Sequence, residues 1–275
     1  MTLINQPDFE KLCQFIYRKT GIQIASSKYS TFGNKIEKMM IKNNLESFRE
    51  FFHLLRFGDG TQLLQELINS ITINETYFYR EKYQFDVLVN KVFYELHNLK
   101  PAGEPLRVLC APSSTGEEPY SIALQLLSEN NIVHKRDIEI VGIDIDSDVI
   151  RRAQNGLFSK RSIQMIPPKI LNDYFEKKSE DVYKITPFLT EAVEFKVANV
   201  MDKTSMKSLG KFDAIFSRNM LIYFDDASKR EVCVTFYEML NQKGWLFLGH
   251  ADNINRATSL FTTVKYGDAL VYKRG

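Results

Sequence analysis

The chain has 275 residues, a formal net charge of +2, 44% hydrophobic residues and 25% charged residues. These values are typical of a soluble globular protein with one large or two modest domains, and the balanced charge gives no argument for nucleic-acid binding. No apolar run approaches the roughly 20 residues that span a bilayer, and no basic segment followed by an apolar one opens the chain, so neither membrane insertion nor a secretory signal is expected. The three cysteines are far apart and show no metal-ligand spacing, which favours a reducing cytoplasm and no metal site.

The first 72 residues are predicted to form an all-α domain. Apolar residues recur at helical spacing in four segments, and Gly21 is expected to end the first helix. The positions that mark the four helices are Phe9, Leu12, Cys13, Phe15 and Ile16; Ile36, Met39 and Met40; Phe51, Phe52, Leu54 and Leu55; and Leu63, Leu64, Leu67 and Ile68. Residues 73–100 are expected to be a linker and a lid over a ligand.

Residues 101–275 alternate between strand and helix patterns, which predicts a doubly wound α/β fold with a parallel sheet. The expected strands are residues 107–110, 138–143, 193–197, 212–217 and 245–249, with a closing edge strand at 269–272. The expected helices are residues 117–128, 148–154 and 228–240. Residues 155–192 are too long for a simple connection, and we interpret them as an inserted subdomain with a short helix and a small antiparallel sheet.

Residues 106–121 read as an apolar strand, a small-residue turn with one glycine, and the start of a helix. A strand that runs into such a turn is how α/β proteins bind nucleotide-like ligands. The turn is followed by Glu117 and Glu118, which would repel a pyrophosphate but suit a cationic ligand. This pattern favours S-adenosylmethionine (SAM) over NAD, as does the absence of a Gly-x-Gly-x-x-Gly motif. Ordinary capping of a helix by two acids is the alternative.

Two further strand ends carry polar residues. Asp144 follows the second expected strand, where a ribose hydroxyl is bound in such folds, while Asp146 is expected to cap the next helix. The fourth expected strand ends in Arg218 and Asn219, with Tyr223 a few residues on. These groups would line the ligand crevice. The alternative places Arg218 on the surface and Tyr223 in the core.

A fourth segment, residues 73–81, combines aromatic and polar residues before the sheet begins. Asn74, Thr76 and Arg80 could face a ligand from a lid, although a linker with satisfied polar groups fits the same spacing.

Together these segments resemble the CheR family of chemotaxis protein-glutamate O-methyltransferases. The resemblance is carried by Asn-Glu-Thr-Tyr-Phe-Tyr-Arg at 74–80, Ser-Thr-Gly-Glu-Glu-Pro-Tyr-Ser at 114–121, Gly-Ile-Asp-Ile-Asp at 142–146 and Ser-Arg-Asn-Met-Leu-Ile-Tyr-Phe-Asp at 217–225. It covers nearly the whole chain, with small departures at Pro112, Ser113 and Tyr79. It implies methyl transfer from SAM to receptor glutamates, which gives glutamyl methyl esters and S-adenosylhomocysteine (SAH) during chemosensory adaptation.

The resemblance also implies the site residues. The expected cofactor contacts are Asn74, Thr76, Arg80, Glu118, Asp144, Asn199, Val200, Arg218 and Asn219, with Glu117 as an alternative to Glu118. Asp144 would bind the ribose, Asn199 and Val200 would flank the adenine, and Tyr223 would lie near the transferring methyl. A glutamate with a pKa of about 4.3 is already ionised at neutral pH, so no general base is needed. Arg80 and Tyr223 are the candidate catalytic residues, because either could orient the incoming carboxylate.

The expected partner is the cytoplasmic helical bundle of a methyl-accepting chemotaxis receptor. Lys35, Lys38 and Lys42 share one helix face, opposite the apolar one, and could dock on acidic receptor helices; a solvated face is the alternative. Residues 175–183 contain no glycine and are short, so tethering to a receptor tail peptide is not expected. A monomer is the default. The competing functions are a SAM methyltransferase with another acceptor and a CheR-like regulator without turnover.

Overall fold

The computed structural model describes residues 4–58, 61–129, 136–254 and 258–275. The chain divides into two compact units. One contains the chain up to Ile73 together with Tyr223–Asp225, and the other contains Asn74–Ile222 and Asp226–Gly275. Among the residues that the structure describes, no helix combines the length and the apolar character needed to cross a membrane.

The first unit is helical, as predicted. It contains α1 (Gln6–Thr20), a 3-10 turn (Ser26–Lys28), α2 (Tyr29–Lys42), α3 (Phe48–Phe57) and α4 (Thr61–Ile71). Gly21 ends α1 in the left-handed conformation, with φ of 73°. The apolar faces form one core that includes Phe9, Ile36, Met40, Phe51 and Leu67. Tyr223–Asp225 belongs to this unit: the Tyr17 hydroxyl donates to Asp225 at 2.6 Å, and the Gln23 amide donates to the Tyr223 carbonyl at 3.5 Å.

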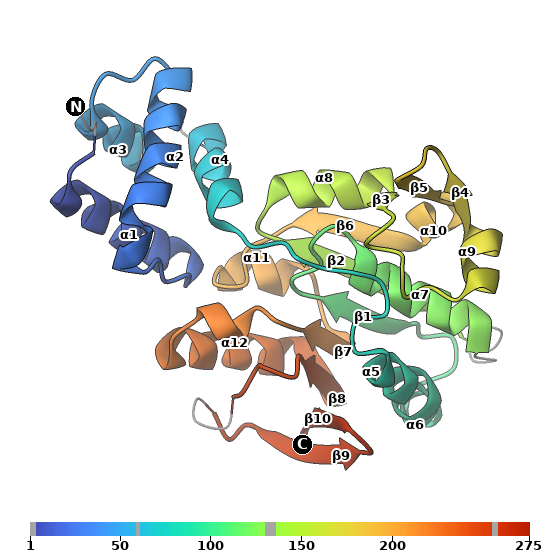
Figure 1. The fold of residues 1–275 in the computed structure, drawn as a ribbon. Helices are drawn as coiled ribbons and strands as arrows, with labels where there is room; N and C mark the ends of the chain where they lie inside the picture. Colours follow the sequence, from blue (N-terminus) through green and yellow to red (C-terminus); the bar gives the residue numbers. More distant parts are fainter. Residues whose placement is uncertain (1–3, 59–60, 130–135, 255–257) are drawn as a thin grey trace. The chain divides into compact units, whose positions relative to one another are not determined.

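The second unit is built on a seven-stranded sheet in the order β6-β2-β1-β7-β8-β10-β9 (Figure 1). The strands are β1 (Leu106–Cys110), β2 (Ile138–Asp144), β6 (Val193–Val197), β7 (Phe212–Ser217), β8 (Leu240–Leu248), β9 (Phe261–Tyr266) and β10 (Ala269–Arg274). The first five in spatial order pair in parallel, and β10 pairs antiparallel with both neighbours. The predicted parallel α/β sheet is confirmed.

The prediction that residues 269–272 close the sheet as its edge strand is wrong. β10 lies between β8 and β9, so β9 is the edge strand. β10 is largely buried at its centre, whereas β9 is exposed or half-buried throughout. Residues 261–266 are rich in β-branched and aromatic residues, but they lack the clear alternation of apolar and polar positions on which the expected strands rest, so they are not among them.

Residues 82–99, expected to belong to a linker and lid, are instead helical. They form α5 (Lys82–Val87), a π-helical turn (Leu88–Val92) and α6 (Phe93–Leu99). Phe85, Leu88, Val92 and Phe93 are fully buried in the main core, because their spacing puts them on one face of the helical segment. This segment packs on β1, β10 and the helix α7 (Glu117–Glu129).

The remaining helices cover the sheet. α7 and α8 (Ser147–Asn155) pack on β2 and β6, whereas α12 (Asp226–Met239) packs on β8 and on α11 (Lys203–Ser208). The chain moves from β1 to β2 and β6 in one direction and from β7 to β8 in the other. Because such crossovers are right-handed, α7 and α8 lie on one face of the sheet and α12 on the other.

The inserted subdomain is confirmed between α8 and β6. Its sheet has the order β3-β5-β4, formed by β3 (Leu157–Ser159), β4 (Phe175–Lys177) and β5 (Val182–Ile185), and all pairs are antiparallel. It also carries α9 (Pro168–Tyr174) and α10 (Pro187–Ala192). Phe158 and Phe175 make edge-on contacts with Phe78, at centroid distances of 4.8 and 5.4 Å, so the insert shares the core of the sheet unit.

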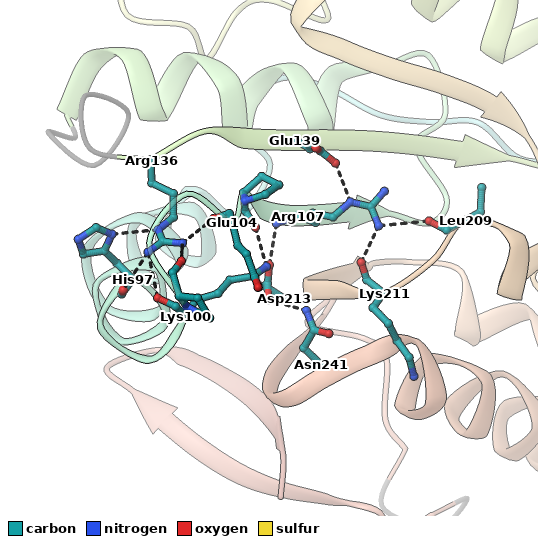
Figure 2. Close-up of polar contacts among 12 residues, drawn as sticks. His97, Lys100, Glu104, Arg107, Arg136, Glu139, Leu209, Lys211, Asp213 and Asn241 are labelled. Atoms are coloured by element: carbon teal, nitrogen blue, oxygen red, sulfur yellow. Dashed lines mark hydrogen bonds and ion pairs between the residues drawn. The ribbon is translucent and has the colours of Figure 1, made fainter.

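At the amino edge of the sheet, charged side chains form hydrogen bonds with one another and with nearby backbone groups (Figure 2). The buried Asp213 carboxylate accepts hydrogen bonds from the Arg107 amide at 2.8 Å, Lys100 Nζ at 2.6 Å and Asn241 Nδ2 at 2.7 Å. The guanidinium of Arg136 donates to the carbonyls of His97, Lys100, Pro101 and Glu104, which lie at and just beyond the end of α6. The Asp213 carboxylate and the Arg136 guanidinium thus find their hydrogen-bond partners within this edge.

Candidate active site

The carboxyl ends of β1 and β7 lie side by side at the point where the strand order reverses. β1 leads through α7 to β2 on one side, and β7 leads through α12 to β8 on the other. In open α/β sheets, ligands bind outside the carboxyl ends of the strands at such a switch point. The site residues predicted from the sequence follow these strands.

The turn after β1 is shaped by Gly116. Gly116 has φ of 97°, and a Cβ atom there would lie 2.9 Å from the Tyr120 ring and 3.0 Å from the Ala153 Cβ. No other residue fits without movement of both neighbours. The same turn is attached to β2, because the Ser114 amide donates to Asp144 Oδ2 at 2.9 Å.

Asp144 lies buried at the end of β2, as predicted. Its carboxylate accepts hydrogen bonds from the backbone amides of Ser114 and Asp146, the latter at 3.0 Å. Burial raises the pKa of Asp144 to about 6, and these amides limit the rise. Asp146 caps α8 through the amides of Asp148 and Val149, which confirms that prediction. Asp146 Oδ2 also accepts from Asn74 Nδ2 at 2.8 Å, so the segment that begins at Asn74 is fixed to this edge.

The adjacent glutamates have different surroundings. Glu117 is buried, with Oε2 accepting from the Thr115 hydroxyl at 2.6 Å and Oε1 from the Ser162 hydroxyl at 2.7 Å. Glu118 Oε2 accepts from Arg218, whereas its buried Oε1 has no hydrogen-bond partner among the described residues. Burial raises the pKa of both carboxyls, and the Arg218 charge lowers that of Glu118. Of these two glutamates, only Glu118 has an oxygen without a hydrogen-bond partner among the described residues.

Arg218 joins three segments of the chain. Its Nη1 donates to Glu118 Oε2 at 2.9 Å, and its Nη2 donates to the Arg80 carbonyl at 2.6 Å and lies 3.3 Å from Glu81 Oε2. Its side chain is 2% exposed, so the alternative that placed Arg218 on the surface is wrong. Two carboxylates around one guanidinium leave this cluster with a net negative charge when both are ionised.

Tyr223 is 37% exposed, so the alternative that placed it in the core is also wrong. It belongs to the helical unit, where its carbonyl accepts the Gln23 amide. Tyr223 directly follows Ile222, the residue at which the preceding part of the sheet unit ends.

The other expected contacts lie near the strand ends. Arg80 is half-buried, and its Nη1 donates to the Glu75 carbonyl at 3.2 Å. Thr76 is half-buried in the same segment. Asn199 and Val200 follow β6, and Asn199 Oδ1 accepts the Met201 amide at 3.0 Å.

Asn219 has φ of 57°, and its amide donates to Asp252 Oδ2 at 2.5 Å. Asp252 was missed in the sequence, although it lies shortly after the carboxyl end of β8, at the same edge of the sheet as Asp144, the last residue of β2. Glu81 was also missed. Besides Arg218, Glu81 contacts Gln84 Nε2 at 2.9 Å and accepts the His250 amide at 3.3 Å. Its position directly after the 74–80 motif was the available signal.

The three lysines of the expected docking face are exposed on α2. Lys35 Nζ donates to the Ser70 carbonyl at 2.7 Å, and Lys42 Nζ pairs with Glu66 at 3.0 Å. Lys35 and Lys42 therefore hold α2 to α4 and the residues beside it, in addition to any role at the surface.

Comparison with known proteins identifies the family. The CheR methyltransferase SAM-binding domain matches residues 74–269, and the CheR all-alpha domain matches residues 7–72. The chain belongs to the CheR methyltransferase family. The chemotaxis protein methyltransferase 2 of Vibrio cholerae is 37% identical over 98% of this chain and 93% of that protein. The chemotaxis protein methyltransferase of Salmonella typhimurium is 30% identical over 94% and 88%. As a CheR member, the protein is a SAM-dependent methyltransferase.

The residues at the carboxyl edge fit the CheR cofactor. Glu118 Oε1, Ser113 Oγ and Ser217 Oγ are buried polar atoms without hydrogen-bond partners among the described residues, and they follow or end β1 and β7. Buried polar atoms without partners are rare in proteins, and a bound ligand is one way in which their hydrogen bonding is completed. Carboxylates at this edge also suit a cofactor that carries an ammonium and a sulfonium.

Proposed function

We propose that this enzyme transfers the methyl group of SAM to glutamate side-chain carboxylates of methyl-accepting chemotaxis receptors. The products are glutamyl methyl esters and SAH, and the role is chemosensory adaptation. The similarity to chemotaxis protein methyltransferases over nearly the whole chain carries the proposal. The acceptor glutamates would belong to the cytoplasmic helical bundle of the receptor, and we therefore assign the enzyme to the cytoplasm.

The proposed cofactor contacts follow from the chemistry of each group. Asp144 would accept hydrogen bonds from the ribose hydroxyls, and Glu118 Oε1 would accept from the amino group of the amino-acid part. Asn199 and Val200 would flank the adenine. The remaining contacts would come from the 74–80 segment and the end of β7, through Asn74, Thr76, Arg80, Arg218 and Asn219.

SAM, when bound, supplies a methyl group on a positively charged sulfur. The acceptor glutamate is ionised at neutral pH, so the protein needs no general base to activate it. The residues around the site would therefore act by orientation, holding the acceptor carboxylate in line with the methyl and excluding water. Arg80 and Tyr223 are the groups proposed to orient that carboxylate, through a cation and a hydroxyl respectively.

The receptor would dock on α2, where Lys35, Lys38 and Lys42 present positive charge to an acidic helix face. Long-range attraction of this kind mainly raises the rate of encounter and fixes the register of the partner. We propose no tether to a receptor tail peptide, because residues 175–183 form a short segment without glycine. A monomer is sufficient for this chemistry.

The test is transfer of labelled methyl from SAM to a purified receptor cytoplasmic domain, followed by mild base. Label released as methanol is expected, because carboxyl methyl esters hydrolyse under these conditions. A receptor domain with its acceptor glutamates replaced by alanine is the matched control and should take up no label. Base-stable label, or no label from an enzyme that binds SAH, would overturn the proposed acceptor.

A further inference from the structure

The geometry points to Asp252 as a positioning residue for the cofactor site. Its carboxylate holds the loop that follows β7, and through this loop it fixes Arg218 and Asn219. This inference rests on the proposed placement of SAM at the carboxyl edge. Asp252 itself does not contact the reacting atoms; it acts through the backbone of the residues beside them.

The carboxylate of Asp252 binds three backbone amides. Oδ2 accepts from Asn219 at 2.5 Å and from Gly249 at 3.1 Å, and Oδ1 accepts from Ile222 at 3.1 Å. Two of these amides lie in the 219–222 segment, which runs into a 3-10 helix (Leu221–Tyr223), and the third directly follows β8. One side chain thus joins the end of β8 to both ends of the loop.

Gly249 supports the same conclusion from packing alone. A Cβ atom at this position would lie 2.9 Å from the Asn219 amide nitrogen and 2.9 Å from Asp252 Oδ2. Such distances are shorter than any normal carbon contact, so the loop approaches β8 as closely as a glycine permits. Asn219 also has φ of 57°, in the left-handed region that asparagine tolerates better than most residues.

The residues around Asp252 hold the other side of Arg218 as well. The His250 amide donates to Glu81 Oε1 at 3.3 Å, and Gln84 Nε2 donates to the Leu248 carbonyl at 2.8 Å. Glu81 Oε2 in turn lies 3.3 Å from Arg218 Nη2. Residues 248–252 therefore fix both the loop that follows Arg218 and the carboxylate that contacts its guanidinium.

A carboxylate is required at position 252 because all of its partners are donors. An ionised carboxyl group is acceptor-only, whereas an asparagine would turn an NH₂ group toward at least one of the three amides. The Asp252→Asn substitution keeps the shape of the side chain and should still release part of the loop. Asp252 is 7% exposed, so water cannot readily replace the lost acceptor.

The experiment measures the Kd of SAH by calorimetry, which does not depend on turnover. Asp252→Asn is expected to raise this Kd about tenfold, the effect of one lost hydrogen bond to a charged group. Asp213→Asn is the matched control, since Asp213 is a buried carboxylate with three hydrogen bonds at the opposite edge of the same sheet (Figure 2). Both substitutions should lower the urea midpoint, but Asp213→Asn should leave the Kd within about twofold.

Gly249→Ala provides a second test in which residue 252 remains an aspartate. The added methyl group would lie 2.9 Å from both the Asn219 amide nitrogen and Asp252 Oδ2, so it should disturb the hydrogen bond between them, and the Kd of SAH should rise in the same direction. Unchanged SAH binding in a folded Asp252→Asn or Gly249→Ala protein would overturn the inference, as would an equal effect of Asp213→Asn. Asp144→Asn separates the two proposals: if it leaves SAH binding unchanged, the proposed cofactor placement is wrong; if it weakens binding while Asp252→Asn does not, only the role of Asp252 fails.

Discussion

Arg218 and Glu118 form a buried ion pair across the switch point of the sheet, with 2.9 Å between Nη1 and Oε2. Their side chains are 2% and 11% exposed, and they come from the end of β7 and the first turn of α7. The pair thus joins the two halves of the sheet at the edge where the cofactor is proposed to bind. Glu81 lies on the other side of the same guanidinium.

Arg218→Ala should destabilise the protein strongly, because it leaves the mostly buried carboxylates of Glu118 and Glu81, 11% and 17% exposed, without this counter-charge. Removal of one partner of a buried pair costs about 3–5 kcal/mol of unfolding free energy. Urea unfolding measures the change. Arg151→Ala is the control, since Arg151 pairs with Asp148 on an exposed helix surface and should cost less than about 0.5 kcal/mol. Equal losses in the two variants would contradict the assigned role of Arg218.

Glu118→Gln should weaken SAH binding about tenfold, because the buried Oε1 is the acceptor proposed for the cofactor amino group. Glu117→Gln is the matched change in the neighbouring carboxyl. Both oxygens of Glu117 are used by Thr115 and Ser162, so its replacement should leave the Kd of SAH within about twofold. The reverse order of the two effects would assign the cofactor contact to Glu117.

The affinity for SAH should depend on pH through Asp144. The pKa of this carboxyl is raised from 3.8 to about 6 in the folded protein, so it takes up a proton as the pH falls through 6. The ionised form is the better acceptor for ribose hydroxyls, and it predominates above pH 6. The Kd of SAH should therefore rise about tenfold between pH 7.5 and pH 5. Asp144→Asn should bind SAH weakly at every pH and should lose the rise in Kd between pH 7.5 and pH 5. If the variant keeps this pH dependence, Asp144 is not the group that causes it.

Ser162→Ala should reveal how the insert is attached to the site. The substitution leaves Glu117 Oε1 buried without its donor, which should cost about 1–3 kcal/mol of unfolding free energy. Ser179→Ala, an exposed serine of the same insert, is the control and should be nearly neutral. Denaturant midpoints measure both, and a neutral Ser162→Ala would show that this hydrogen bond contributes nothing to stability.

Lys38→Glu should raise the KM for the receptor domain about threefold or more and leave the Kd of SAH unchanged, because charge reversal on the docking face opposes an acidic partner. Lys38 is preferable to Lys42, whose reversal would also face Glu66 within the helical unit. Lys11→Glu, an exposed lysine on α1, controls for the change in net charge. Equal KM values for the two variants would remove α2 from the docking surface.

Much of the fold could be predicted because its signals are local. The amphipathic spacing of Phe9, Leu12 and Ile16 identified α1, and apolar runs between turn residues identified β1, β2, β6 and β7. β9 is not among the predicted strands, because this exposed edge strand has no clear alternation of buried and exposed residues. The prediction of a linker over residues 82–99 is wrong, because Val92 and Phe93 are fully buried in the core from one face of a helical segment.

The sequence by itself determined that Asp144, Arg218 and the turn around Gly116 meet at one edge, because parallel strands bring their carboxyl ends together whatever their lengths. Only the tertiary structure decided which polar atoms remain available there. Glu117 and Glu118 are adjacent acids of the same type in the sequence. In the structure, the Ser162 hydroxyl from the insert donates to Glu117 Oε1, whereas Arg218 donates to Glu118 Oε2 and Glu118 Oε1 has no partner among the described residues. Asp252 likewise gains its role from amides 30 and 33 residues away. Hydrogen bonds between distant segments depend on how those segments pack, so the spacing of residues along the sequence does not predict them.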